Sequence, residues 1–106
     1  MKSVFVPAVL GAAAIALLAS ASARAADESA LAKAKNCLAC HTVDKKLVGP
    51  AYKEVAKKYK GQNVVDKLAE KVRKGGVGVW GQIPMPPNAV VNEAESKRLV
   101  QWVLSM

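Results

Sequence analysis

The chain has 106 residues, 52% of them hydrophobic, and its 16 basic and 8 acidic residues give a formal net charge of +8. Two cysteines allow at most one disulfide, which excludes a disulfide framework. A basic protein can bind nucleic acid, but none of the nucleic-acid recognition motifs is present.

The first 25 residues have the order of a secretory signal peptide. Lys2 supplies the positive charge, residues 4–18 are uncharged and apolar, and small residues end in Ala23-Arg24-Ala25. A retained membrane anchor is the alternative, but the apolar run is shorter than the ~20 residues needed to cross a bilayer. We therefore expect cleavage after Ala25, no stable membrane insertion, and a domain of residues 26–106 in the periplasm.

This mature domain is near the lower size limit for a self-sufficient core, so something beyond the chain must complete it. Lys2 and Arg24 leave with the signal, so 14 basic and 8 acidic residues remain, a net charge of +6. In an exported, monomeric protein this charge favours docking to an acidic partner surface over nucleic acid.

The elements of the mature domain are predicted to be helices, and no alternating strand pattern competes, so the expected class is all-α. The four segments are about residues 28–36, 51–60, 64–74 and the stretch after residue 92. The second is the clearest, with Tyr52, Val55, Ala56 and Tyr59 at amphipathic helical spacing. Its opposite face carries lysines, which are either a simple solvated face or part of a docking surface.

Breaking and capping residues mark where these helices begin and end. Gly61 is expected to stop the second helix, and Gly75 with Gly76 the third. Asn92 and Glu95 have the spacing of a capping box at the start of the last helix. The intervening segment, residues 77–91, is rich in proline and glycine and is expected to be a functional loop without regular structure.

The motif Cys37-Leu38-Ala39-Cys40-His41 is the attachment signature of c-type haem. Two thiols at this spacing can add to the two vinyl groups of a haem, and the adjacent histidine then lies under the iron. A thioredoxin-type redox pair would need a βαβ pattern, which is absent. A structural zinc site would need four ligands, and a plain disulfide would leave His41 unexplained.

The second iron ligand is expected to be Met85. His41 is the only histidine, so two histidine ligands from one chain are excluded. Met85 lies 44 positions further on, between Pro84 and Pro86, which preset the backbone. A lysine ligand remains the competing interpretation. With both axial positions filled by protein, no site is open to O₂ or peroxide, which favours electron transfer over catalysis.

The mature sequence closely resembles the small bacterial class I cytochromes c of the cytochrome c-551/c-552 (c8) family. The matching residues are the haem motif, Leu47-Val48-Gly49-Pro50-Ala51-Tyr52, the run from Gly78-Val79-Trp80 through Ile83-Pro84-Met85-Pro86-Pro87-Asn88, and Trp102-Val103-Leu104. The resemblance implies the class I fold, about four short helices wrapped around one covalently bound haem.

The resemblance also implies roles for four further residues. Pro50 is expected to offer its carbonyl to the His41 ring N–H, and Trp80 to donate its indole N–H to a haem propionate. Lys71, with Arg73 close by, is expected to face a propionate. Asn88 is expected to approach the Met85 sulfur.

The resulting hypothesis is a periplasmic single-electron carrier, not an enzyme. It would carry electrons between a quinol-oxidising complex and a terminal acceptor such as a nitrite reductase or a cytochrome oxidase. Apolar residues around the haem edge would dock, with Lys45 and Lys46 steering the encounter. The alternative is a haem enzyme or gas sensor whose iron site opens.

Overall fold

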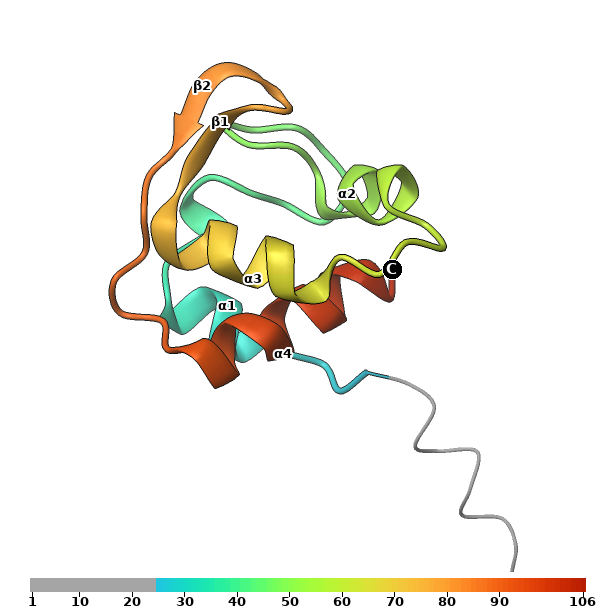
Figure 1. The fold of residues 1–106 in the computed structure, drawn as a ribbon, viewed down its shortest axis with the longest axis vertical. Helices are drawn as coiled ribbons and strands as arrows, with labels where there is room; N and C mark the ends of the chain where they lie inside the picture. The colour runs from blue at the N-terminus through green and yellow to red at the C-terminus, as the bar shows by residue number, and fades with distance from the viewer. Residues whose placement is uncertain (1–24) are drawn as a thin grey trace, which may run out of the picture.

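The computed structural model describes residues 25–106, which form four α-helices, a short 3₁₀ helix and a small β-hairpin (Figure 1). Residues 1–24, which carry nearly all of the predicted signal peptide, lie outside the described part of the chain. The elements in chain order are α1 (Ser29–Ala34), η2 (Cys37–Ala39), α2 (Tyr52–Lys58), α3 (Val65–Lys74), β1 (Gly76–Gly78), β2 (Gly81–Met85) and α4 (Glu93–Leu104).

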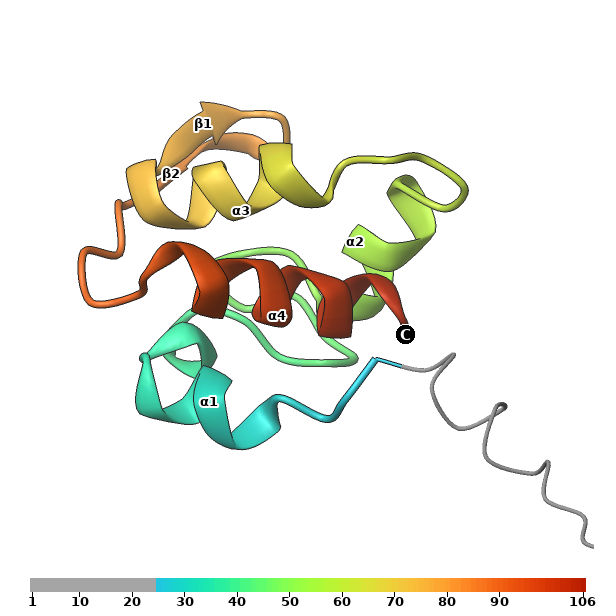
Figure 2. The same ribbon diagram turned by 60° about the horizontal axis from the view of Figure 1, so that its bottom comes forward.

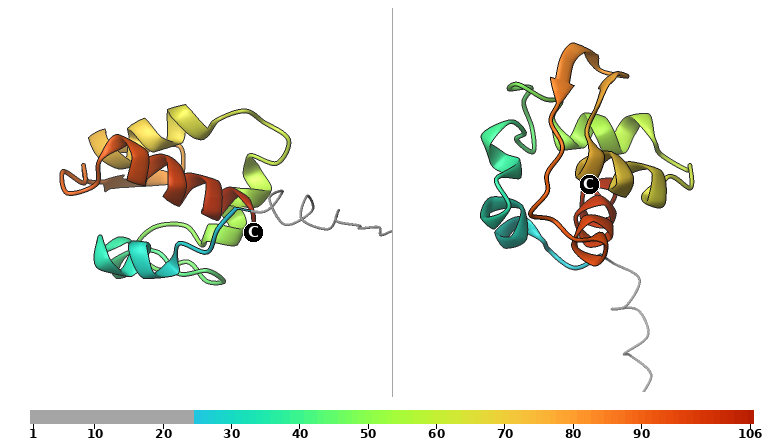
Figure 3. Two further views of the ribbon diagram at one scale, coloured as in Figure 1. Left: turned by 90° about the horizontal axis from the view of Figure 1, so that it is seen from below. Right: turned by 60° about the vertical axis from the view of Figure 1, so that its left-hand side comes forward.

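Helix α4 is the central element of the fold. Figures 2 and 3 show α3 lying along one side of it and α1 on the other, while α2 packs near its C-terminal end. The residues that α4 buries are Ser96, Leu99 and Val100, which lie three and four positions apart and so share one face. The last predicted helix is therefore present, and its buried face is the one around which the other helices pack.

The start of α4 is fixed by the predicted capping box. The Glu95 backbone N–H donates to Asn92 Oδ1 at 2.8 Å, and the Asn92 backbone N–H donates to Glu95 Oε1 at 3.1 Å. Two of the amide groups that a helix start leaves without partners are thus satisfied.

The first helix is shorter than predicted. The sequence pattern suggested one helix over about 28–36, but α1 ends at Ala34 and Asn36 takes a left-handed conformation with φ of 66°. Asparagine tolerates this conformation better than most residues. The turn at Asn36 redirects the chain into η2, which starts at Cys37.

The prediction that residues 77–91 lack regular structure is wrong for their first half. Strands β1 and β2 pair as an antiparallel hairpin, with Gly78 opposite Gly81 and Gly76 opposite Met85. Gly78 and Gly81 have φ of 107° and 115°, values that other residues rarely adopt. Pro84 can lie in β2 because a two-stranded sheet has only edge strands, where a missing N–H is tolerated.

The described core contains few large side chains. Ala32, Val91 and Leu99 form its buried cluster, with Leu31, Val72 and Trp102 packed around it. The largest side chain that is less than 2% exposed in residues 25–106 belongs to Ser96. Helices this short enclose little on their own, and many of the larger apolar side chains line a cavity.

Two ion pairs fasten α1 to α4 outside this core. Arg98 donates to both carboxylate oxygens of the buried Glu28, at 3.0 and 2.9 Å. At the other end of α1, Lys35 Nζ lies 3.5 Å from Glu95 Oε2. Within residues 25–106 there is no helix long and apolar enough to span a membrane.

Candidate functional site

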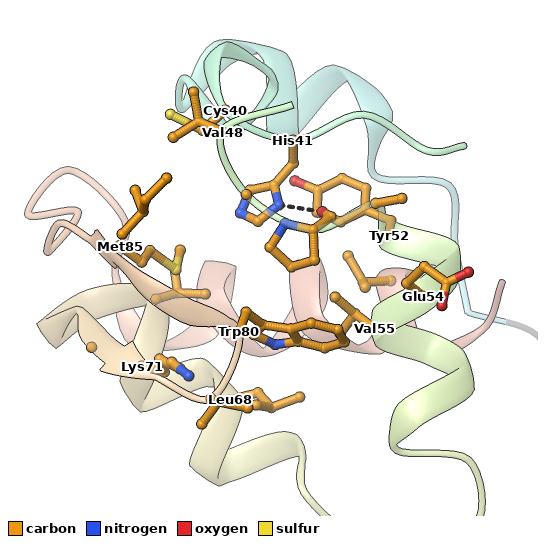
Figure 4. A pocket seen from close by; sticks show the side chains of 18 of the residues that line it. Cys40, His41, Val48, Tyr52, Glu54, Val55, Leu68, Lys71, Trp80 and Met85 are labelled. Atoms are coloured by element: carbon orange, nitrogen blue, oxygen red, sulfur yellow. Dashed lines mark hydrogen bonds between the residues drawn. The ribbon is translucent and has the colours of Figure 1, made fainter. Parts of the chain in front are cut away.

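A cavity of about 590 Å³ brings together residues from η2, α2, α3, the hairpin and α4. One wall is η2 and the loop after it, and the opposite wall is the hairpin β1–β2 (Figure 4). Helices α2 and α3 contribute apolar side chains between these walls, among them Val55, Leu68 and Val72. The cavity is thus a largely apolar slot with chemically distinct groups at its two walls.

The imidazole of His41 projects into the cavity with one nitrogen already engaged. His41 Nδ1 lies 2.8 Å from the Pro50 carbonyl oxygen, which is the hydrogen bond that the family resemblance implied. A carbonyl oxygen only accepts, so Nδ1 carries the proton and Nε2 keeps its lone pair. Such a bond to the far nitrogen orients a ligating histidine and raises its basicity. The ring is therefore prepared to bind a metal through Nε2.

Two further neighbours restrict the plane of the imidazole. The Tyr52 ring stacks on it, with centroids 5.0 Å apart and planes inclined by 20°. A Cβ at Gly49 would come within 2.5 Å of His41 Cε1, a distance that real side chains do not tolerate. Gly49 therefore allows the backbone to approach the ring. Neither contact was foreseen from the sequence, although both residues lie in the matched Leu47–Tyr52 run.

The two cysteines line the cavity on the wall that carries His41. Both are free thiols and half-buried. Their turn is held by N–H groups of Cys40 and His41, which donate to the Cys37 carbonyl at 3.2 and 3.1 Å. Burial raises the pKa of the Cys37 thiol above its usual value. The pair is not bridged, so both sulfurs are free to bond elsewhere.

Met85 lies on the opposite wall, at the end of β2, with its side chain directed into the cavity (Figure 4). Its carbonyl is packed closely against α3, because a Cβ at Gly75 would come within 2.6 Å of the Met85 oxygen. Gly75 also has φ of 79°, so glycine suits this position both because it lacks a Cβ and because it readily adopts a positive φ. The end of α3 thus fixes the backbone that carries Met85.

Lys71 and Trp80, for which the resemblance implied contacts with the haem propionates, both line the cavity. The stem of Lys71 runs over Gly76, where a Cβ would meet Lys71 Cε at 3.0 Å. Arg73, the alternative basic residue, instead donates to Ser96 Oγ at 3.0 Å, so its guanidinium binds a side chain of α4. Of the two, Lys71 is the one that faces the cavity.

Asn88 is not among the residues that line the cavity. Its side-chain nitrogen donates to the Lys35 carbonyl at 2.8 Å, and its backbone N–H donates to the Val72 carbonyl at 3.0 Å. In addition, the Val90 N–H donates to Asn88 Oδ1 at 3.2 Å. Asn88 therefore ties the segment after Met85 to α1 and α3. An amide nitrogen has two hydrogens, so one remains for another acceptor.

These residues fit a covalently bound haem. The cavity is apolar and open at one side, as a flat macrocycle with charged propionates requires. The walls present two free thiols, an imidazole with a free Nε2 and a thioether sulfur. Residues 25–106 contain no cluster of three or more His, Cys, Asp or Glu side chains that could hold a metal by themselves.

Comparisons with known proteins give the same picture. The family profile "Cytochrome c" matches residues 25–106. The chain is 51% identical to cytochrome c-551 of Stutzerimonas stutzeri, over 100% of this chain and 99% of the relative. It is 58% identical to cytochrome c-552 of Hydrogenobacter thermophilus over 77 residues, which are 72% of this chain and 78% of that protein.

Solved structures match at the level of the fold. The crystal structure of Nitrosomonas europaea cytochrome c552 superposes with a TM-score of 0.71 at 50% sequence identity. The match covers 73% of this chain and 96% of that one.

Proposed function

The chain belongs to the cytochrome c family, and from this premise we propose that it is a periplasmic carrier of single electrons whose haem iron is held between His41 and Met85. Membership means that the domain has the class I cytochrome c fold and carries one covalently attached haem c, and that it is an electron carrier. The ligands, the compartment and the partners are the parts that we propose.

Attachment is assigned to Cys37 and Cys40. Their sulfurs would form thioether bonds to the two vinyl groups, which keeps the cofactor bound in a compartment where free haem could be lost. The support is that both thiols are unbridged and lie at the cavity wall. Bound haem supplies an iron centre that accepts and releases one electron.

The placement of His41 and Met85 on opposite walls of one cavity is the observation that carries the proposal. His41 would bind through Nε2, while the Pro50 carbonyl holds the Nδ1 proton and fixes the ring. Met85 would bind through its sulfur from the hairpin wall, and a thioether ligand raises the reduction potential. Two protein ligands leave no position for a substrate, as suits a carrier.

Three other side chains are assigned supporting roles. Lys71 would face a propionate with its ammonium, and Trp80 would donate its indole N–H to a propionate. Both line the cavity, which supports these roles. Asn88 would direct its remaining amide hydrogen at the Met85 sulfur, since its other contacts already hold it beside that segment.

The location and partners follow from the leader and the charge. Residues 1–25 have the order of a secretory signal, so export to the periplasm is proposed. Partners would be redox proteins, such as a quinol-oxidising complex as donor and a nitrite reductase or cytochrome oxidase as acceptor. Exposed apolar side chains that line the cavity, including Val48, Val77 and Ile83, would form the contact, with Lys46 at its edge.

Carbon monoxide tests whether the iron is closed. The reduced haem-loaded protein should show no spectral change with CO at neutral pH, because Met85 occupies the position that CO needs. Met85→Ala should bind CO and have a lower reduction potential. Met106→Ala, which removes a methionine at the chain end, is the matched control and should change neither property.

Two outcomes would contradict the assignment. Rapid and tight CO binding by the unaltered protein would favour a haem enzyme or gas sensor. An unchanged potential and CO affinity in Met85→Ala would mean that another side chain, such as a lysine, binds the iron.

A further inference from the structure

Lys58 is the last residue of α2, and its ammonium lies over an aromatic ring of the hairpin. Lys58 Nζ is 5.6 Å from the centroid of the Trp80 ring and 5.8 Å from that of Tyr59. Both distances are within the range at which a cation is attracted to the face of a ring. None of the ion pairs in residues 25–106 includes Lys58. Its charge is therefore not drawn to a carboxylate in this part of the chain.

Trp80 lies in the turn between β1 and β2, and this turn has few other contacts. A Cβ placed on Gly78 or Gly81, the glycines on either side, would meet no atom within 4 Å. Val77, Val79 and Trp80 are 60%, 50% and 39% exposed. The turn is thus not enclosed by the core, and its position depends on a small number of surface contacts.

The contact between Lys58 and Trp80 joins two sides of the same cavity. Val55 and Tyr59 line it from the α2 side, and Trp80 lines it from the hairpin. In Figure 4 the Trp80 ring and the Val55 side chain are both drawn among the residues that line the cavity. A cation that holds the indole at this point also sets the direction of its N–H relative to the cavity.

We propose that Lys58 is a positioning residue, which holds the Trp80 indole and the hairpin turn against α2 and so keeps this side of the haem pocket closed. The proposal rests on the proposed function, in which Trp80 donates its N–H to a haem propionate. It adds a residue to which the sequence analysis assigned no role. Lys58 does not contact the cofactor in this proposal and acts through Trp80.

The test uses the reduced, haem-loaded protein and nuclear magnetic resonance of its indole N–H groups. Lys58→Met keeps the length of the side chain and removes the charge, while Lys58→Arg keeps a cation that can lie over the ring. Lys57→Met removes a charge from the neighbouring position, which is also exposed. The chain has two tryptophans, so Trp80→Phe identifies the Trp80 signal, and Trp102 serves as an internal reference.

Lys58→Met should exchange the Trp80 indole hydrogen with solvent about two- to fivefold faster, the change expected when an exposed cation–π contact is lost. Lys58→Arg should restore the original rate. Lys57→Met, and the Trp102 signal in every variant, should stay unchanged. Equal effects of Lys57→Met and Lys58→Met, or no effect of either, would overturn the proposal.

The test of Lys58 can be distinguished from the test of the proposed iron ligands. The absorption spectrum and CO response report on His41 and Met85, and the Lys57 and Lys58 variants should keep them. If CO bound freely while Lys58→Met still moved Trp80, the ligand assignment would fall and the role of Lys58 would remain.

Discussion

His41 is fixed by three neighbours from one short stretch of chain, and each acts on a different part of its ring. The Pro50 carbonyl accepts the Nδ1 proton at 2.8 Å, Tyr52 covers the ring with nearly parallel planes, and Gly49 leaves the space that the ring occupies. The hydrogen bond selects the tautomer, and the other two contacts select the plane. Together they determine how Nε2 is presented to the cavity.

Gly49→Ala should disturb this arrangement. The new Cβ would lie 2.5 Å from His41 Cε1 and 2.9 Å from Nδ1, so the imidazole or the backbone must move. Forcing an extra carbon into a packed site costs about 1–3 kcal/mol. Denaturant unfolding of the haem-loaded protein should show a loss of this size, together with a changed reduction potential.

Gly76→Ala is the matched control for this prediction. Its Cβ would meet only the flexible stem of Lys71, at 3.0 Å, and that stem can shift. The cost should therefore be smaller, and the His41 environment should not change. If Gly49→Ala were as stable as Gly76→Ala and kept its potential, the close approach to His41 would not matter.

Individual residues differed in how far the sequence could assign them. Met85 could be proposed from composition, because His41 is the only histidine and two prolines flank Met85. The role of Pro50 came from resemblance alone, and the structure contains that hydrogen bond. Gly49 and Lys58 gave no sequence signal, because each acts through a contact whose direction only the folded chain defines.

At the scale of elements, the capping box of α4 links one carboxylate to the pH dependence of stability. The Asn92 backbone N–H donates to Glu95, which lowers the pKa of this carboxyl below its usual 4.5. A lowered pKa in the folded state adds stability that is present above pH 4.5 and is lost as the pH falls below that value.

Glu95→Gln should therefore be less stable than the unaltered protein at pH 7, and the difference should shrink as the pH falls below 4.5. Thermal unfolding of the haem-loaded protein between pH 3 and 7 measures it. Glu70→Gln removes a largely exposed carboxylate that pairs with Lys74 at 3.6 Å, and it should have little effect. A stability difference that stays constant across this range would show that the cap does not depend on the Glu95 charge.

The helices were predictable from the sequence, whereas the hairpin and the exact end of the first helix were not. Helix α4 follows from a capping pair and an apolar face that repeats at helical spacing, both of which are visible in the sequence. The hairpin has no such signal, because its side chains are mostly exposed and its turn depends on the positive φ of Gly78 and Gly81. Likewise, Asn36 ends the first helical segment through a backbone conformation that periodicity does not report.

At the scale of the molecule, the core is small because most of the larger apolar side chains line the cavity. The side chains of the described chain that are completely enclosed are small ones, Ala32, Ala69 and Ser96, while leucine, valine and aromatic side chains line a space of about 590 Å³. The sequence predicted that something must complete the core, from chain length alone. It could not predict which side chains would face that space, because this depends on how α2, α3 and the hairpin pack.

The chain without haem should consequently fail to fold cooperatively. The double variant Cys37→Ala, Cys40→Ala, prepared free of haem, exposes the apolar walls of the cavity to water. A domain of this size needs the burial of that apolar surface to be stable. Circular dichroism should show reduced helix content and no sharp unfolding transition. Added haem should restore helix without a covalent bond, because His41, Met85 and the apolar walls remain. A haem-free chain that unfolded in one sharp transition, at the same denaturant midpoint as the haem-loaded protein, would show instead that α4 and its neighbours form a sufficient core.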